Sequence, residues 1–160
     1  MKEKFNMFKF INFYKQDEKL AIDYIENKID KRTLSQKSWR KIAQYKKGLS
    51  RSFIKKYIDK FKIIDLCINQ NLSEALMKEN LHQLDEQIWS LISEFQILSE
   101  SFIEEFQKNL DWYRISRYQK LSLDFLVKFK NEIIYDNIRY NKKISKEIKK
   151  KFFDYLKLIK

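Results

Sequence analysis

The chain has 160 residues, of which 44% are hydrophobic and 35% charged, and its formal net charge is +12. This composition is typical of a folded globular chain and excludes a disordered one. Proline is absent and Gly48 is the only glycine. Tight hairpin turns depend on glycine, proline, asparagine and aspartate, so a sheet protein of this size is excluded as well. We therefore expect an all-α protein.

The first 38 residues contain a dense aromatic segment that lies outside the pattern of the rest of the chain. Its large apolar residues are Phe5, Phe8, Phe10, Ile11, Phe13 and Tyr14, followed at helical spacing by Leu20, Tyr24, Ile25 and Ile29. We expect residues 1–38 to form a helical cap over the open end of the fold; the alternative is an aromatic docking patch for a partner. Lysines interrupt the aromatic run, unlike in a signal peptide, and no apolar run reaches the roughly 18 residues of a membrane span. The expected location is therefore cytoplasmic.

Residues 39–160 consist of about five tandem repeats, and successive copies are 23 residues apart where the pattern is clearest. An aromatic anchor is followed by isoleucine three residues later, then by Leu-Ser or Ile-Ser, and then by further apolar residues. The copies are anchored at Trp39, Trp89, Trp112 and Tyr135, with a weaker copy from Leu66 to Asn80 that about three extra residues follow. Gly48 is one inserted residue in the first copy.

The Leu-Ser motif predicts the start of a helix, because a serine hydroxyl at an N-cap accepts a backbone N–H of the first turn. The apolar residue before the serine and the fourth residue after it then form a hydrophobic staple. The expected pairs are Leu49 with Ile54, Leu72 with Met77, Leu98 with Ile103, and Leu121 with Leu126. Lys149 interrupts the pattern in the last copy, where we expect it to face solvent.

Each repeat is expected to form a short helix, a tight joint and a longer helix. In the fourth copy the short helix starts at Trp112 with Asp111 as its N-cap, and the longer one continues to Ile133. A single unit cannot bury its aromatic face alone, so neighbouring units must stack. We expect a short α-solenoid of helix-turn-helix repeats, a single domain overall, and a compact helical bundle is the alternative.

The stretch from Trp112 to Phe125 reads Trp-x-x-Ile-Ser-x-Tyr-Gln-x-Leu-Ser-x-x-Phe. It resembles a tandem helical repeat of uncharacterised proteins in giant viruses and large phages, and residues 92–106 are similar to it as well. The resemblance covers roughly residues 39–156. It implies a helical-repeat fold, a viral or mobile-element origin and the cytoplasm of a host cell, and it supplies no catalytic residues.

The residues that usually carry catalysis are almost absent. His82 is the only histidine and Cys67 the only cysteine, which excludes a multi-histidine metal site and a disulfide framework. We expect an exposed histidine and a buried structural thiol. With Gly48 as the only glycine, there is no phosphate-binding loop of the Walker or dinucleotide type. Adjacent carboxylates such as Glu104 and Glu105 are expected on a solvated helix face. We therefore expect no enzyme, no cofactor and no metal site.

Charge divides the chain into three segments: residues 1–62 carry +11, residues 63–111 carry −8 and residues 112–160 carry +9. The basic binding candidates are Arg114, Arg117, Arg139, Lys142, Lys143, Lys146, Lys149 and Lys150. Of these, Lys142, Lys146, Lys149 and Lys150 are expected to share one helical face. The acidic candidates form a strip that would mimic nucleic acid and occupy a basic cleft, and they are Glu94, Glu100, Glu104 and Glu105. Because Arg114 and Arg117 become Leu91 and Glu94 in the preceding copy, a nucleic-acid reader that uses every repeat alike is not favoured.

Three functions remain after these exclusions. The favoured hypothesis is a non-catalytic protein-binding module. In the viral setting that the resemblance implies, it would inhibit a host protein that handles nucleic acid, such as an RNA-guided CRISPR nuclease. The first alternative is an RNA- or DNA-binding protein that uses its basic ends, directly or through a ribonucleoprotein. The second alternative is a structural or scaffold component of a virion. No membrane partner is expected.

Overall fold

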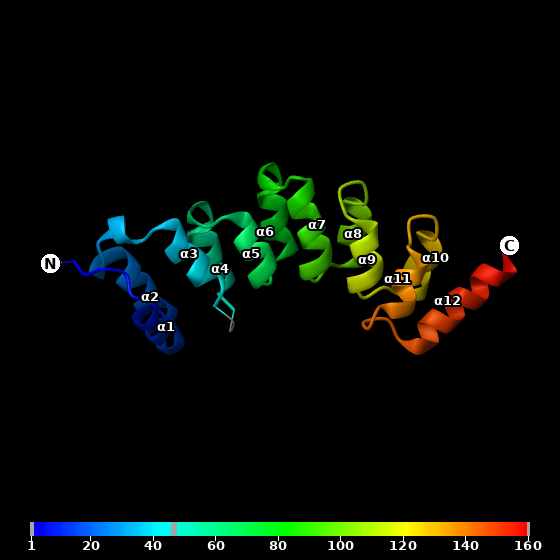
Figure 1. Ribbon diagram of the computed structural model, residues 1–160, viewed down its shortest axis with the longest axis horizontal. Helices are drawn as coiled ribbons and strands as arrows, with labels where there is room; N and C mark the ends of the chain where they lie inside the picture. The colour runs from blue at the N-terminus through cyan, green and yellow to red at the C-terminus, as the bar shows by residue number, and fades with distance from the viewer. Residues whose placement is uncertain (1, 46–47, 160) are drawn as a thin grey trace. The chain divides into compact units, whose positions relative to one another are not determined.

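A computed structural model describes residues 2–45 and 48–159, and these residues form an all-α protein (Figure 1). Within them β structure is limited to an isolated bridge between Glu3 and Ile29. Lys46, Lys47 and Lys160, which count toward the segment charges above, lie outside the described residues. The chain divides into two compact units, Met1–Ser73 and Glu74–Lys160. The boundary between them falls inside the second repeat.

The first unit contains the N-terminal segment, the first repeat and the first helix of the second repeat. Its elements are α1 (Met7–Gln16), α2 (Glu18–Asp23), the π-helix η1 (Tyr24–Lys28), the 3₁₀-helix η2 (Lys31–Thr33), α3 (Gln36–Ala43), α4 (Arg51–Lys56), the 3₁₀-helix η3 (Ile58–Lys60) and α5 (Ile63–Asn69). α1 packs against α2 and α3, and α3 packs against α5.

The aromatic N-terminal segment packs against the first repeat. Phe10 is fully buried, with its ring centroid 5.8 Å from that of Phe53 on α4, and the ring of Tyr14 lies 5.4 Å from the same phenylalanine. The Tyr14 hydroxyl also accepts the backbone N–H of Ser50, the N-cap of α4. Phe8, by contrast, is 80% exposed. The segment therefore covers α4 and presents Phe8 to solvent.

The second unit contains the rest of the second repeat and the third, fourth and fifth repeats. Its elements are α6 (Glu74–Glu79), the 3₁₀-helix η4 (Leu81–Gln83), α7 (Glu86–Phe95), α8 (Glu100–Glu105), α9 (Trp112–Tyr118), α10 (Leu123–Lys128), α11 (Tyr135–Tyr140) and α12 (Lys146–Leu158). The first helices of successive repeats pack together, α7 against α9 and α9 against α11, and α10 packs against α12 (Figure 1).

The second helices of the third and fourth repeats are shorter than the sequence predicted. α8 and α10 have six residues each, whereas α7 has ten and α9 seven. α10 ends at Lys128, and its C-cap is Phe129, whose N–H bonds to the Phe125 carbonyl. The N–H groups of Glu132 and Ile133 then bond back to the Phe129 carbonyl. The prediction of a longer helix was wrong because a turn, and not a further helical turn, returns Ile133 to the core.

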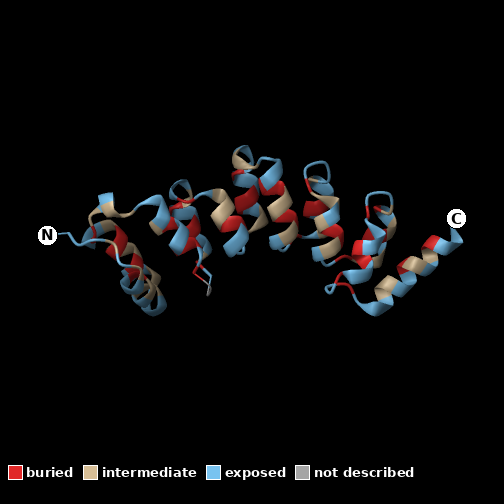
Figure 2. Ribbon diagram, in the orientation of Figure 1, coloured by how far each residue is buried: buried red, intermediate tan, exposed pale blue. Residues whose placement is uncertain are grey.

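The repeat recurs in the core as one aromatic pair. The ring pairs, with centroid separations of 5.3, 5.3 and 5.4 Å, are Trp39 with Tyr57, Trp89 with Phe106, and Trp112 with Phe129. In Figure 2 buried residues recur along the helices among intermediate and exposed ones, and the outermost turns are exposed. The repeated aromatic and aliphatic positions are therefore those that the core requires.

The predicted helix starts are confirmed. The serines that cap the N-termini of α4, α8, α10 and α12, each accepting the N–H three residues later, are Ser50, Ser99, Ser122 and Ser145. Asp111 caps α9 in the same way. All eight residues of the predicted staple pairs are buried, as a staple requires.

A buried glutamine connects the fourth repeat to the third, which the sequence analysis did not predict. The Gln119 side chain donates to the carbonyls of Ser93 at 2.9 Å and Gln96 at 2.8 Å, and it accepts the N–H of Leu98 at 3.3 Å. These backbone groups lie at the end of α7 and in the joint after it, where a helix leaves carbonyls without partners. We call this arrangement the amide bracket.

The amide bracket recurs along the chain. Gln70 brackets the first repeat, donating to the Tyr45 carbonyl at 3.1 Å and accepting the Leu49 N–H at 2.7 Å. Asn141 brackets the fourth repeat by donating to two carbonyls at the end of α9, at 2.9 and 2.8 Å. The sequence alignment placed Asn141 at the position of Tyr118, and the structure instead gives it the role of a bracketing amide.

Lys149 takes the corresponding role at the end of α11. The sequence predicted that it faces solvent, but it is half-buried, and its ammonium donates to the carbonyls of Arg139, at 3.0 Å, and Asn141. That prediction was wrong because the carbonyls at the end of α11 also need donors, and Lys149 supplies them.

A buried serine makes a second connection between repeats. The Ser93 hydroxyl accepts the backbone N–H of Asp111 at 3.0 Å, and the Ser116 hydroxyl accepts that of Ile134 at 3.0 Å. The acceptor in each case lies 18 residues before the donor, so the same bond joins the third repeat to the fourth and the fourth to the fifth. Cys67 occupies the corresponding position of the second repeat and is fully buried.

Candidate binding surfaces

The exposed side of α9 and α11 carries two tyrosines and an arginine. Tyr113 and Arg117 lie one helical turn apart on α9, and Tyr113 is 61% exposed. The Arg117 guanidinium lies 5.1 Å from the ring centroid of Tyr140 on α11, and Tyr140 is 67% exposed. Among the described residues Arg117 forms no ion pair with a carboxylate. We call these three residues the tyrosine–arginine face.

The two other arginines predicted for binding are held by the chain itself. Arg114 forms ion pairs with Glu94 and, at 3.1 Å, with Asp111. The Arg139 guanidinium lies 4.4 Å from the ring centroid of Phe153 and 3.7 Å from the Asp136 carboxylate. Of the three predicted arginines, Arg117 is therefore the one that has no carboxylate partner among the described residues.

The four acidic candidates all contact residues of a neighbouring repeat. The contacts are those of Glu94 with Arg114, Glu100 with Ser122, Glu104 with Lys128, and Glu105 with Lys78. Glu100 has a structural role, because it accepts both the backbone N–H and the hydroxyl of Ser122, the N-cap of α10. The acidic side chains thus compensate charges and donors inside the second unit instead of standing free as a strip.

Four lysines around the start of α12 form an exposed group. All four are exposed, and none forms an ion pair with a carboxylate of the described residues; they are Lys142, Lys143, Lys146 and Lys150. We call them the lysine cluster. Lys149, which the sequence placed on the same face, is not part of it, because its ammonium is turned onto the carbonyls at the end of α11.

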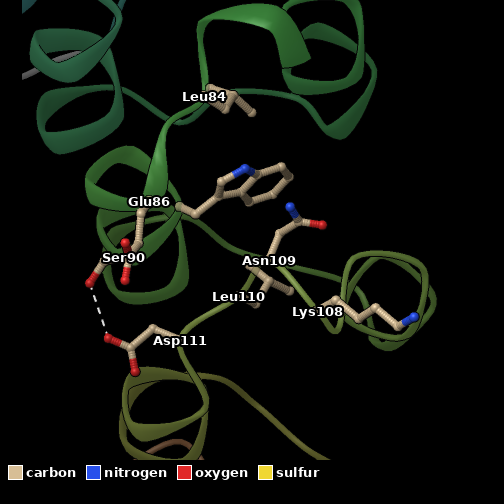
Figure 3. Close-up of a pocket in the computed structure, with 8 residues that line it drawn as sticks. Leu84, Glu86, Ser90, Lys108, Asn109, Leu110 and Asp111 are labelled. Carbon is tan, nitrogen blue, oxygen red and sulfur yellow. Dashed lines mark hydrogen bonds between the residues drawn. The ribbon is translucent and has the colours of Figure 1, made fainter.

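A cavity of about 470 Å³ lies in the third repeat (Figure 3). One wall is the start of α7, with Glu86, Trp89 and Ser90, and the other is the segment that leads from α8 to α9, with Asn109 and Asp111. The Ser90 hydroxyl donates to the Asp111 carboxylate at 3.0 Å, which joins the two walls on one side.

The hydrogen bonding of the Trp89 indole differs from that of the aromatic anchors in the next two repeats. Trp112, the equivalent residue, donates its indole N–H to the Gln107 carbonyl at 3.0 Å, and Tyr135 donates its hydroxyl to the Lys130 carbonyl at 3.0 Å. Both acceptors lie five residues before the donor. Trp89 is only 5% exposed, yet its indole N–H makes no hydrogen bond with a described residue.

The described residues contain no assembled metal site. No group of three or more histidine, cysteine, aspartate or glutamate side chains is placed there to hold a metal ion. Cys67 is buried as predicted, and burial raises the pKa of its thiol to about 12, so it stays protonated and is a poor nucleophile. His82 is exposed as predicted. No helix of the described residues is long and apolar enough to cross a membrane.

Sequence reasoning missed the residues that connect the repeats. Gln96 and Gln119 stand 23 residues apart in the Tyr-Gln and Phe-Gln pairs of the motif, so a polar residue recurs where the pattern is otherwise apolar. Both are almost fully buried. A buried amide must be hydrogen-bonded, and that requirement was the available signal for the bracket. No comparable signal marked the Trp89 cavity, because the indole N–H that it leaves without a protein partner is a local difference from the next two copies.

Comparison with known proteins adds no relative. No family model, curated protein or solved structure matches the chain. The fold defines an all-α protein.

Proposed function

We propose that this chain is a non-catalytic protein-binding module, a short solenoid of helical repeats that docks on a partner protein through the tyrosine–arginine face. The support for a solenoid is that the first helices of successive repeats pack together within the second unit. The support for a docking role is that the repeated residues build the core, while the exposed residues differ from copy to copy.

The observation that carries the proposal is the exposure of Tyr113 and Tyr140 beside Arg117. Tyrosine and arginine are enriched at the centres of protein interfaces, where they contribute a large share of binding energy. Stacking over Tyr140 orients the Arg117 guanidinium in advance, so less side-chain entropy is lost on binding. Exposed aromatic groups of this size, next to a charge without a carboxylate partner, favour a partner surface that is partly apolar and partly acidic.

The test is capture of the partner from the natural host by the tagged chain, with and without nuclease treatment, followed by mass spectrometry. We expect one protein to be recovered after nuclease treatment. Replacing Tyr113 and Tyr140 together by alanine should reduce its recovery at least tenfold, by the usual effect of losing two aromatic contact residues. Phe8→Ala is the control, because Phe8 is also an exposed aromatic residue but lies in the other unit. Loss with Phe8→Ala alone would instead support the N-terminal aromatic patch as the docking site.

The resemblance to repeats of giant viruses and large phages gives this proposal a more specific form. In that form the partner is a host protein that handles nucleic acid, such as an RNA-guided nuclease, and the chain inhibits it. Assay of the captured protein with and without the chain tests this role. If the chain leaves the activity of the captured protein unchanged, the inhibitor role is wrong and the proposed binding function stands.

A second candidate function, binding of RNA or DNA, is favoured by the lysine cluster alone. Four unpaired ammonium groups within nine residues suit a phosphate backbone, whose binding releases counterions. If nucleic acid is the ligand, affinity should fall steeply with salt, and replacing the four lysines by glutamine should flatten that dependence. Capture that disappears entirely on nuclease treatment would select this function over the first.

A further inference from the structure

We propose that the cavity of the third repeat binds an extended peptide segment, with the Trp89 indole N–H donating to a main-chain carbonyl of that segment. The inference rests on the proposed protein-binding function and assigns it a second contact, on the same unit as the tyrosine–arginine face.

The cavity lies where the aromatic anchor of a repeat meets the connection before it, a place that is also hollow at Trp39 and Tyr135. In the fourth and fifth repeats the polar atom of the aromatic anchor reaches the carbonyl five residues earlier, at Gln107 and Lys130. Before Trp89 the connection carries the extra residues of η4, and the residue five positions earlier, Leu84, lines the cavity instead of accepting a hydrogen bond. The Trp89 indole N–H is therefore left without the carbonyl partner that the connection supplies in the fourth and fifth repeats.

The Trp89 donor is available to a ligand. Tryptophan is 95% removed from solvent at this position, and a buried indole N–H usually has a partner. The described residues have no fully buried side-chain nitrogen or oxygen without a hydrogen-bond partner. The unpartnered N–H of Trp89 is therefore reached by solvent, and the cavity is the open space that this side chain lines.

The other polar groups of the cavity select the class of ligand. The Asn109 amide faces the cavity from the opposite wall, makes no hydrogen bond with a described residue, and offers one acceptor and two donors. Asp111 is already engaged by Ser90 and Arg114, and the remaining charges, Glu86 and Lys108, are of opposite sign. A phosphate or a free carboxylate would meet no net positive charge here.

A peptide main chain fits these groups. It alternates acceptors and donors, so one carbonyl accepts from Trp89 while a neighbouring peptide group pairs with the Asn109 amide. A volume of about 470 Å³ is within the range of ligand cavities and accommodates a short segment of chain.

The first test observes the indole N–H resonances of the three tryptophans in the intact, ¹⁵N-labelled chain, each assigned by a Trp→Phe variant. The probe is capped triglycine (acetylated and amidated), which presents main-chain groups only. We expect the Trp89 resonance to shift and to saturate at probe concentrations on the order of millimolar to tens of millimolar, while the Trp112 resonance stays fixed. An absent shift, an equal shift of Trp112, or an equal response to acetate or inorganic phosphate would overturn the inference.

The second test uses the captured partner and a matched pair of variants. Trp89→Phe removes the available donor, whereas Trp112→Phe removes a donor that is satisfied inside the chain. Recovery of the partner should fall about tenfold with Trp89→Phe and remain unchanged with Trp112→Phe. Asn109→Ala, at an exposed position outside the core, should lower recovery as well and guards against a folding defect of Trp89→Phe.

The outcomes separate this inference from the proposed function. Full recovery with both Trp89→Phe and Asn109→Ala overturns the peptide site and leaves the tyrosine–arginine face as the interface. If the unmodified chain captures no protein, the proposed function fails, and the triglycine response still decides whether the cavity binds main-chain groups.

Discussion

The third and fourth repeats have the same core and different surfaces. Trp89 and Trp112 hold equivalent places in it, with nearly equal distances to Phe106 and Phe129. Yet Trp112 donates its indole N–H to the Gln107 carbonyl, whereas the indole N–H of Trp89 bonds to no described residue and Trp89 lines a cavity. Glu94 of the third repeat becomes Arg117 in the fourth.

The difference separates two kinds of constraint on one repeated sequence. Positions that face a neighbouring repeat must satisfy the same backbone groups in each copy, so Ser93 and Ser116 are alike. Positions that face solvent have no such requirement, and a change there creates a new surface without loss of the fold. Binding is therefore expected where equivalent copies diverge, and stability where they agree.

The largest effect is expected for the reactivity of the Cys67 thiol. Cys67 occupies the position at which the third and fourth repeats have serine. Because burial raises the pKa of this thiol to about 12, the native chain should react with a disulfide reagent at pH 8 at least ~100-fold more slowly than the chain unfolded in guanidinium. The unfolded thiol, with its ordinary pKa near 9, ionises first. The thiol's contribution to stability should thus be complete below pH 9 and decline as pH rises toward 12. Equal reaction rates in the two states would show that this position is not part of the core.

Gln119→Ala should have the next largest effect. It leaves two carbonyls and one N–H without the bracketing amide, and the free energy of unfolding should fall by about 2–4 kcal/mol. Gln107→Ala, at an exposed position of the preceding turn, is the control and should change stability by less than ~0.5 kcal/mol. Both values come from urea denaturation followed by circular dichroism. Similar losses for the two variants would contradict a special role for the bracket.

Lys149→Met tests whether the last repeat is closed in the same way as the others. The variant keeps the length of the side chain but removes the donor to the carbonyls of Arg139 and Asn141, and we expect a loss of about 1 kcal/mol. Lys150→Met, one residue away in the lysine cluster, should leave stability nearly unchanged. A loss for Lys150→Met as large as that for Lys149→Met would indicate that the charge, and not the carbonyl contact, stabilises α12.

Lys128→Ala should have the smallest effect. Its ion pair with Glu104 joins the third and fourth repeats at 2.5 Å, but both side chains are about half exposed, so the loss should stay below about 0.5 kcal/mol. The loss should shrink further at 1 M salt. Thermal unfolding at low and high salt measures it, and a loss above 1 kcal/mol would place this pair among the structural connections.

The core and the helix starts were predictable from the sequence because their signals are local and repeated. Ser122 precedes an apolar helix at the spacing of a cap, and Leu121 and Leu126 stand where a staple places them. The length of α10 was not predictable, because Ile133 satisfies the same apolar pattern whether a helix or a turn returns it to the core. The role of Lys149 depends on carbonyls of another helix, which no local pattern encodes.

The candidate surfaces were predicted less well, for the same reason. The sequence does not distinguish the three candidate arginines, but the structure gives each a different contact. Arg114 forms an ion pair with Glu94, and Arg117 stacks on the exposed Tyr140. Arg139 stacks on Phe153 and lies beside Asp136. Which cation stays available to a partner is decided by its neighbours across the repeat boundary. The sequence therefore located the basic residues without selecting among them.

The amide bracket also sets the steps in which this chain can change length. Each bracket reaches back from one unit to the end of the previous helix, so removal of a whole unit, such as residues 112–134, brings Asn141 to the carbonyls that Gln119 now holds. In the shortened chain the Asn141 amide would still donate to these carbonyls. Deletion of half a unit would instead join two helices that do not follow each other in the repeat. The loop of η4, outside the bracketed spans, accommodates about three extra residues, and Gly48 is a single added residue inside the span that Gln70 brackets. We expect natural and engineered versions of such a chain to differ by complete 23-residue units and by small loop insertions. The hydrogen bonds of the amide bracket should be kept between the units that remain.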